Sequence, residues 1–114
     1  MIPHCSLRAV FIAAMTLALA PLAHAEDAQT IDLALKGTAF TPGEIRVPAG
    51  KPFIIKFTNG NAAPVELEAK DLKIEKVAAG NSEIVVRVKA MPAGKYLFVD
   101  EYQEDVAKGY VIVE

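Results

Sequence analysis

The stretch FTPGEIRVPAGKPFIIKFTN, residues 40–59, carries the pattern that decides the fold. Apolar side chains recur at every second position over residues 44–47 and again over 53–58, which is the period of half-buried strands. Between them, Pro48-Ala49-Gly50 has the composition of a turn. The stretch therefore predicts two short strands joined by a turn.

The same alternation continues on both sides of this stretch, and no window shows a sustained apolar stripe with a helical period. We expect further strands at residues 31–36, 65–69, 72–74, 83–88, 95–99 and 109–113. One short helical turn fits within residues 101–108. Seven or eight short strands separated by Gly, Pro or Asn predict an all-β protein, an antiparallel Greek-key β-sandwich.

Residues 1–25 have the features of a secretory signal peptide. Arg8 supplies positive charge, and the apolar run that follows, residues 9–20, is shorter than the roughly 20 residues that span a bilayer as a helix. The sequence Ala23-His24-Ala25 fits a cleavage site. We expect cleavage after Ala25, export to the periplasm, and a single domain over residues 26–114 that does not insert into the membrane. A retained N-terminal anchor is the alternative.

Removal of this segment changes which chemistry is available. The chain of 114 residues has a formal net charge of −2, and its single cysteine and both histidines (Cys5, His4 and His24) lie within the expected signal peptide. The mature chain then lacks the residues for Ser-His-Asp or Cys-His catalysis, for Cys/His zinc sites and for a blue-copper centre. The charge balance also gives no basic face for nucleic acid. Any site must depend mainly on oxygen ligands.

Carboxylates are concentrated in two places. Glu66 and Glu68 are two apart on an expected strand, so their side chains leave the same face. The segment DEYQED, residues 100–105, holds four more. Concentrated carboxylates repel one another, and a cation relieves the repulsion. Oxygen ligands suit Ca²⁺, Mn²⁺ and iron, and hold Cu²⁺ less tightly than imidazole does. Two interpretations stay open: a metal site, or a solvated strand face and a solvated turn.

The order of the segments resembles the cupredoxin family over residues 31–113. The resemblance rests on residues 40–59, a loop that ends in Pro64, the strand AGKYLFVD (93–100) and the strand GYVIV (109–113). It places Val65, Asp100, Gln103 and Ala107 or Lys108 where that family has its copper ligands. No histidine or cysteine stands at these positions, so the resemblance does not extend to blue-copper electron transfer.

Two segments, PVELEAKDLKIEKV (64–77) and DEYQEDVAKG (100–109), resemble the EfeO-type cupredoxin-like domains. That resemblance implies a small exported component of a bacterial ferrous-iron uptake system. Its partners would be a second periplasmic metal-binding protein and an inner-membrane ferric permease. It also implies that acidic residues bind iron or copper and that the two segments meet at one end of the sandwich. The matching residues are Glu66, Glu68, Asp100, Glu101 and Glu104.

The expected function is therefore a periplasmic protein that binds iron (Fe²⁺/Fe³⁺), with copper as a further candidate. An anionic oxygen site favours Fe³⁺ over Fe²⁺ because attraction grows with charge. Such a site supports oxidation of ferrous iron, together with a partner protein, and transfer to the permease. Tyr102 either assists at the site or packs at the base of its loop. The alternatives are a metal-free module that docks a permease or a periplasmic partner, and a copper carrier without a redox role.

Overall fold

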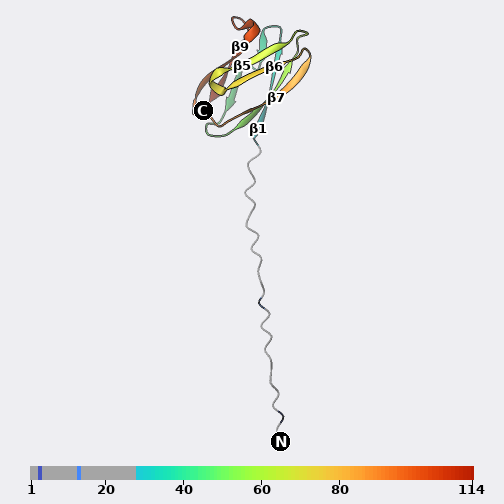
Figure 1. The fold of residues 1–114 in the computed structure, drawn as a ribbon. Helices are drawn as coiled ribbons and strands as arrows, with labels where there is room; N and C mark the ends of the chain where they lie inside the picture. Colours follow the sequence, from blue (N-terminus) through green and yellow to red (C-terminus); the bar gives the residue numbers. More distant parts are fainter. Residues whose placement is uncertain (1–2, 4–12, 14–27) are drawn as a thin grey trace.

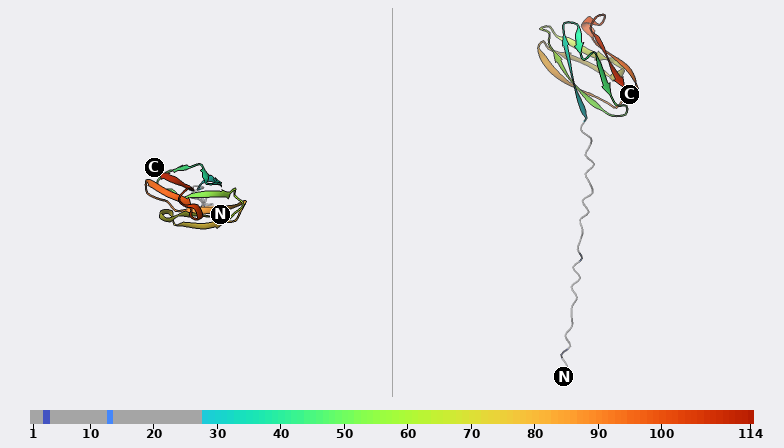
Figure 2. Two further views of the ribbon diagram at one scale, coloured as in Figure 1. Left: turned by 90° about the horizontal axis from the view of Figure 1, so that it is seen from above. Right: turned by 180° about the vertical axis from the view of Figure 1, so that it is seen from behind.

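Two β-sheets packed face to face form the protein (Figures 1 and 2). The computed structural model describes residues 3, 13 and 28–114. The expected signal peptide, residues 1–25, thus lies almost entirely outside the described residues, and cleavage after Ala25 stays a prediction. In the described part of the chain, no helix has the length and apolar composition needed to cross a bilayer.

Residues 28–114 form nine strands and two short 3-10 helices. In chain order they are β1 (Gln29–Lys36), β2 (Ala39–Thr41), β3 (Glu44–Val47), β4 (Phe53–Asn59), β5 (Val65–Ala69), η1 (Lys70–Leu72), β6 (Ile74–Ala78), β7 (Ser82–Val88), β8 (Gly94–Asp100), η2 (Glu101–Gln103) and β9 (Lys108–Val113). One sheet has the order β2-β1-β4-β7, and the other has the order β3-β9-β8-β5-β6.

The expected all-β sandwich and the helical turn after residue 100 are confirmed, and three details differ. The strand expected at residues 72–74 begins only at Ile74, as β6, because Lys70–Leu72 form η1. The ninth strand is β2, which the sequence pattern does not predict because Pro42 and Gly43, residues typical of a turn, follow it directly. Phe40 in β2 instead pairs with Leu35 of β1. The sheets are also mixed, since β1 pairs with β4 and β3 pairs with β9 in parallel. After β2, the chain crosses to the other sheet and forms β3. It then returns to the first sheet as β4, which runs in the same direction as β1.

The alternation of each strand fills the space between the sheets. Phe40 packs its ring edge-on against Phe98, with centroids 4.9 Å apart and an interplanar angle of 89°, and lies 6.2 Å from the ring of Phe57. These rings join β2 and β4 of one sheet to β8 of the other. Edge-on aromatic pairs add stability beyond the area they bury. Because the inward-facing side chains are packed, the strand backbones that carry the outward-facing side chains are held in fixed positions.

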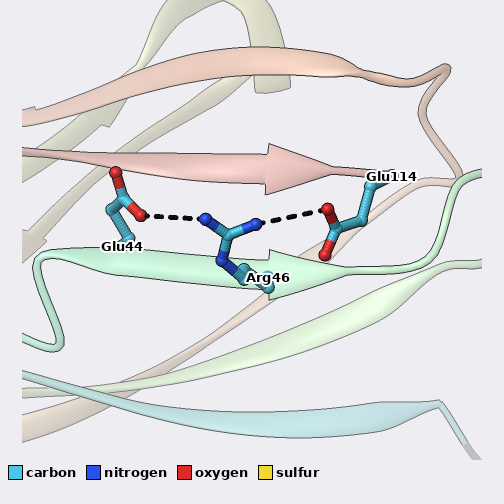
Figure 3. Close-up of polar contacts among 3 residues, drawn as sticks. All are labelled: Glu44, Arg46 and Glu114. Carbon is cyan, nitrogen blue, oxygen red and sulfur yellow. Dashed lines mark hydrogen bonds and ion pairs between the residues drawn. The ribbon is translucent and has the colours of Figure 1, made fainter.

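A salt-bridged arginine lies across the parallel β3–β9 edge (Figure 3). The Arg46 guanidinium is 3.4 Å from a Glu44 carboxylate oxygen and 3.2 Å from one of Glu114. All three side chains are more than half exposed, and exposed ion pairs contribute little. Backbone bonds hold this edge: the Glu114 N–H donates to Val47, and the Ala49 N–H donates to Glu114, both at 3.0 Å.

The buried amide of Asn59 fixes the loop that leads into β5. Its Nδ2 donates to the carbonyl oxygens of Ala63, Ala78 and Ala79 at 2.9, 3.2 and 3.1 Å, and its Oδ1 accepts from the Asn61 N–H at 2.9 Å. This amide joins the end of β4, the β4–β5 loop and the β6–β7 turn. The turn approaches the loop so closely that a Cβ at position 80 would overlap the Ala62 carbonyl, which glycine avoids.

Replacement of Asn59 by Ala removes this connection and leaves buried carbonyl groups without a donor. We expect a loss of about 2–4 kcal/mol in the free energy of unfolding, measured by urea denaturation. Thr58→Ala, on the exposed face of the same strand, is the matched control and should change stability by less than about 0.5 kcal/mol. Equal effects of the two substitutions would show that the Asn59 bonds do not organise the loop.

Candidate metal centre

Strand β5 presents two carboxylates on the outer surface of the five-stranded sheet. Val65, Leu67 and Ala69 belong to the core, so the alternate residues Glu66 and Glu68 face outward. Strand geometry places two such side chains about 7 Å apart at their Cα atoms. Glu66 is half-buried, and Glu68 is only 7% exposed although it faces outward. Neighbouring side chains therefore shield one of the two carboxylates from water.

The short helix η2 brings a third carboxylate to this pair. Glu101 is the first residue of η2 and follows directly after β8. One carboxylate oxygen from each of Glu66, Glu68 and Glu101 can be chosen so that all three lie within 4.8 Å of one another. We call these residues the three-carboxylate group. Figure 1 shows η2 at the pole of the sandwich opposite the start of β1.

The crowding of these acids shows in the proton affinity of Glu101. Hydrogen bonding to the carboxylates of Glu66 and Glu68 is the largest cause, followed by loss of water and by their negative charges. Together they raise the pKa of Glu101 from its ordinary value of 4.5 to about 7. Glu101 therefore keeps its proton to a higher pH than an isolated carboxyl group does. A bound cation would replace that proton and relieve the same repulsion.

Glu75 is a fourth carboxylate on the same face, and the sequence analysis missed it. It lies in β6 directly opposite Glu68 of β5. Hydrogen bonding to Glu66 and the negative charge of Glu66 are the main causes that raise the pKa of Glu75. The sequence did contain a signal for Glu75. Ile74 is apolar and expected to point into the core, so the next strand residue, Glu75, points outward. The register that pairs Glu75 with Glu68 depends on η1, which the strand pattern did not predict.

Lys70 provides a positive charge inside this acidic surface. Its Nζ lies 3.6 Å from Oε1 of Glu68, and its side chain is 83% exposed. A depression of about 500 Å³ is lined by both residues and by Lys73, Glu75 and Glu101. The lysine ammonium therefore acts as a weak, water-exposed counter-ion at the margin of the three-carboxylate group.

Asp100 lies outside the three-carboxylate group. It is 1% exposed and points inward, like Phe98 two residues before it. Its Oδ1 accepts hydrogen bonds from the backbone N–H of Glu66 and of Tyr102, at 3.1 and 3.2 Å. Its Oδ2 accepts one from Gln103 Nε2 at 2.9 Å. The carboxylate is thus occupied by three donors within the protein.

Glu104 and Tyr102 lie at the edges of the acidic surface. Glu104 is exposed and shares a depression of about 210 Å³ with Glu68, Leu97 and Val99. Tyr102 is 58% exposed, so its ring is not enclosed at the base of the loop. Loss of water around its phenol and the negative charges of Glu66 and Glu101 raise the pKa of Tyr102.

The structure thus brings together three of the five residues predicted as metal ligands. Glu66, Glu68 and Glu101 form one group, whereas Asp100 is turned into the interior and Glu104 lies to one side. Metal binding by these residues stays a prediction. The donor set is chemically suited to a hard cation because carboxylate oxygens converge on one place.

Comparison with known proteins identifies the family. Residues 9–113 match the sequence profile of the cupredoxin-like domain, so the chain belongs to the cupredoxin-like domain family. An uncharacterized protein of Rickettsia prowazekii (strain Madrid E) is 25% identical over 83 residues, which are 73% of this chain and 66% of that protein. The chain thus spans just under two thirds of that relative's length.

Two solved structures show the same fold at low sequence identity. The first is the metal-binding domain of the Cu(I)-exporting P-type ATPase CopA from Streptococcus pneumoniae, determined with Cu(I). It has a TM-score of 0.67 at 20% identity, over 75% of this chain and 84% of that chain. The second is auracyanin A, a "blue" copper protein of Chloroflexus aurantiacus. It has a TM-score of 0.63 at 20% identity, over 75% of this chain and 98% of that chain.

The positions that the family resemblance assigns to copper ligands are filled by other chemistry here. Val65 and Ala107 are buried apolar residues. Asp100 and Gln103 are hydrogen-bonded to each other. This pole of the sandwich is therefore closed by packing and hydrogen bonds, and the convergent carboxylates lie on the adjacent outer surface of the sheet.

The raised pKa of Glu101 predicts a specific pH dependence of stability. Because the pKa of Glu101 is raised to about 7 in the folded protein, the folded state keeps a proton that the unfolded chain releases near pH 4.5. This contribution to stability is complete below about pH 4.5 and is lost as pH rises through about 7. We expect the metal-free wild type to lose more stability than Glu101→Gln across this window, measured by denaturation in the presence of a chelator.

Glu104→Gln is the control for this measurement, because it removes a nearby carboxylate that is outside the three-carboxylate group. It should keep the pH dependence of the wild type. Identical slopes for wild type and Glu101→Gln would contradict a raised pKa of Glu101 in the folded protein.

Proposed function

We propose that the protein is an exported iron-binding protein that carries its cargo ion on Glu66, Glu68 and Glu101. The observation that supports this proposal is the convergence of three carboxylate oxygens within 4.8 Å, contributed by two segments more than 30 residues apart in the chain. Glu75 lies beside them and is available as a further oxygen ligand. The EfeO-type resemblance of residues 64–77 and 100–109 supports the same assignment.

The donor chemistry favours Fe³⁺ over Fe²⁺. Three carboxylates carry up to three negative charges, and their attraction for an ion grows with its charge. The low exposure of Glu68 weakens screening by water on one side of the group. Tighter binding of Fe³⁺ lowers the reduction potential of the bound iron, so oxidation of ferrous iron becomes easier. The electron goes to an acceptor outside this chain, such as a bound copper ion of a partner protein.

The position of the group is suited to transfer of the ion. Glu101 is exposed on η2, and the depression beside it is open to solvent. A partner can therefore approach the bound ion without unfolding of the sandwich. We propose that the ion passes to an inner-membrane ferric permease, with a second periplasmic metal-binding protein as the other partner.

A copper carrier without a redox role is the second candidate. The structural neighbours whose names include copper support it, since they share this fold. Cu²⁺ accepts carboxylate ligands, although it prefers imidazole. A copper carrier would bind Cu²⁺ at the same residues and would leave the rate of ferrous oxidation unchanged.

Titration of the mature protein with metal tests the proposal. With Fe³⁺ added as a nitrilotriacetate complex, a free concentration one hundred times Kd should stabilise the fold by about 2.7 kcal/mol. For a domain of this size that is a rise in Tm of about 10 °C or more. Glu101→Gln and Glu66→Gln should each weaken binding about tenfold, because each removes one charged oxygen ligand.

Glu83→Gln is the matched control, since Glu83 is an exposed strand carboxylate in the other sheet. It should bind iron like the wild type. The proposal fails if Glu101→Gln binds as tightly as Glu83→Gln. A response to Cu²⁺ alone favours the copper carrier, and no metal-dependent change in Tm favours a metal-free docking module.

The lysine beside the group should tune its affinity. Lys70 lies 3.6 Å from Glu68 and competes with an incoming cation for the same carboxylate. We expect Lys70→Gln to tighten metal binding about twofold to fivefold, in line with the small energy of an exposed ion pair. Lys89→Gln, at the end of the other sheet's edge strand, is the control and should have no effect. Weaker binding by Lys70→Gln would contradict this role.

A further inference from the structure

Among the carboxylates of residues 28–114, the most fully buried one is also the one that accepts the most hydrogen bonds. Asp100 is 1% exposed, and three donors from two elements meet its two oxygens at 2.9 to 3.2 Å. The Glu66 N–H comes from β5, whereas the Tyr102 N–H and the Gln103 amide come from η2. Asp100 itself ends β8. One side chain thus joins three elements.

Two of the joined segments carry the proposed ligands. The donor from β5 is the backbone N–H of Glu66 itself. The donors from η2 belong to the two residues that follow Glu101, and Asp100 caps this helix through the Tyr102 N–H. Asp100 therefore holds the backbone of β5 at Glu66 and the backbone of η2 next to Glu101, and so sets the distance between these two segments.

We propose that Asp100 is a positioning residue for the three-carboxylate group and not a ligand of the ion. This inference rests on the proposed function, in which Glu66, Glu68 and Glu101 hold the metal. The geometry separates the two roles. Asp100 lies on the inward face of β8 with Phe98, whereas Glu66 and Glu68 lie on the outward face of β5.

The energetics agree with a positioning role. Hydrogen bonds to a carboxylate are stronger than those to a neutral acceptor. A ligand role would require Asp100 to release donors that are buried with it, and a buried N–H without an acceptor is destabilising. Coordination by Asp100 would therefore work against the contacts that hold Glu66 and η2 in place.

Asp100→Asn separates position from charge. The asparagine Oδ1 can accept from the same two backbone N–H groups. Rotation of the Gln103 amide by 180° lets its oxygen accept from the new Nδ2. The contacts are kept and the negative charge is lost. A positioning role predicts Fe³⁺ affinity within about threefold of the wild type, whereas a ligand role predicts a loss as large as that of Glu101→Gln, about tenfold.

A second measurement tests, in the absence of metal, whether Asp100 holds the backbone of β5 and η2 in place. Amide hydrogen exchange at Glu66 and Tyr102, followed by NMR in the metal-free protein, should keep its wild-type protection in Asp100→Asn. In Asp100→Ala both amides lose their acceptor and should exchange at least about tenfold faster. If Asp100→Ala does not fold, Asp100→Asn still separates positioning from ligation, since a ligand would lose Fe³⁺ affinity while the two amides stay protected.

The two proposals fail in different ways. If Asp100→Asn binds Fe³⁺ as weakly as Glu101→Gln while the Glu66 and Tyr102 amides stay protected, Asp100 is a ligand and the positioning role is overturned. Unchanged protection in a folded Asp100→Ala also overturns it. If Glu101→Gln binds iron like the wild type, the proposed function is wrong, and the exchange data still report whether Asp100 positions η2 and β5.

Discussion

The proposed metal site depends on one electrostatic constraint: three carboxylate oxygens are held within 4.8 Å of one another on the outer surface of a packed sheet. The separation of Glu66 and Glu68 is set by β5, and Glu101 is brought to them by η2. The group cannot be fully ionised without strong repulsion. Hydrogen bonding to Glu66 and Glu68, with the repulsion of their charges, raises the pKa of Glu101 to about 7, so Glu101 holds its proton to a higher pH than an isolated carboxyl group does.

The sandwich around the group explains why the carboxylates stay together in spite of this repulsion. Edge-on packing of Phe40 against Phe98 fixes the inward side of β8. Asp100, two residues later on the same side, fixes the start of η2 and the backbone of Glu66. The rigid interior thus maintains an arrangement on the outer surface that would relax if these side chains were on flexible loops. The hydrogen bonds of Asp100 at this pole thus hold in place the backbone that carries Glu66 and Glu101.

Strand parity made much of this predictable from sequence. The alternation of residues 44–47 and 53–58 gave the sandwich, and the spacing of Glu66 and Glu68 gave their shared face. Parity also held a signal that the sequence analysis did not use. Asp100 stands two residues after Phe98, so strand alternation already placed its side chain on the inward face of β8.

Other features depend on contacts that no local pattern reveals. Glu75 lies opposite Glu68 because η1 sets the register of the β5–β6 hairpin. The strand β2 depends on burial of Phe40 against the far sheet. The meeting of β5 with η2, more than 30 residues later, came from the family resemblance, because spacing in one sequence does not report distance between segments. These long-range contacts required the structure.

The location of the ion itself is the most direct test of the central claim. Crystals of the mature protein soaked in iron can be measured on both sides of the iron absorption edge, and the anomalous difference map gives the metal position. The account predicts one peak on the outer surface of the five-stranded sheet, about 2 Å from oxygens of Glu66, Glu68 and Glu101. A peak at Asp100 and Gln103 inside the pole, or peaks only at carboxylates remote from β5 and η2, would contradict it.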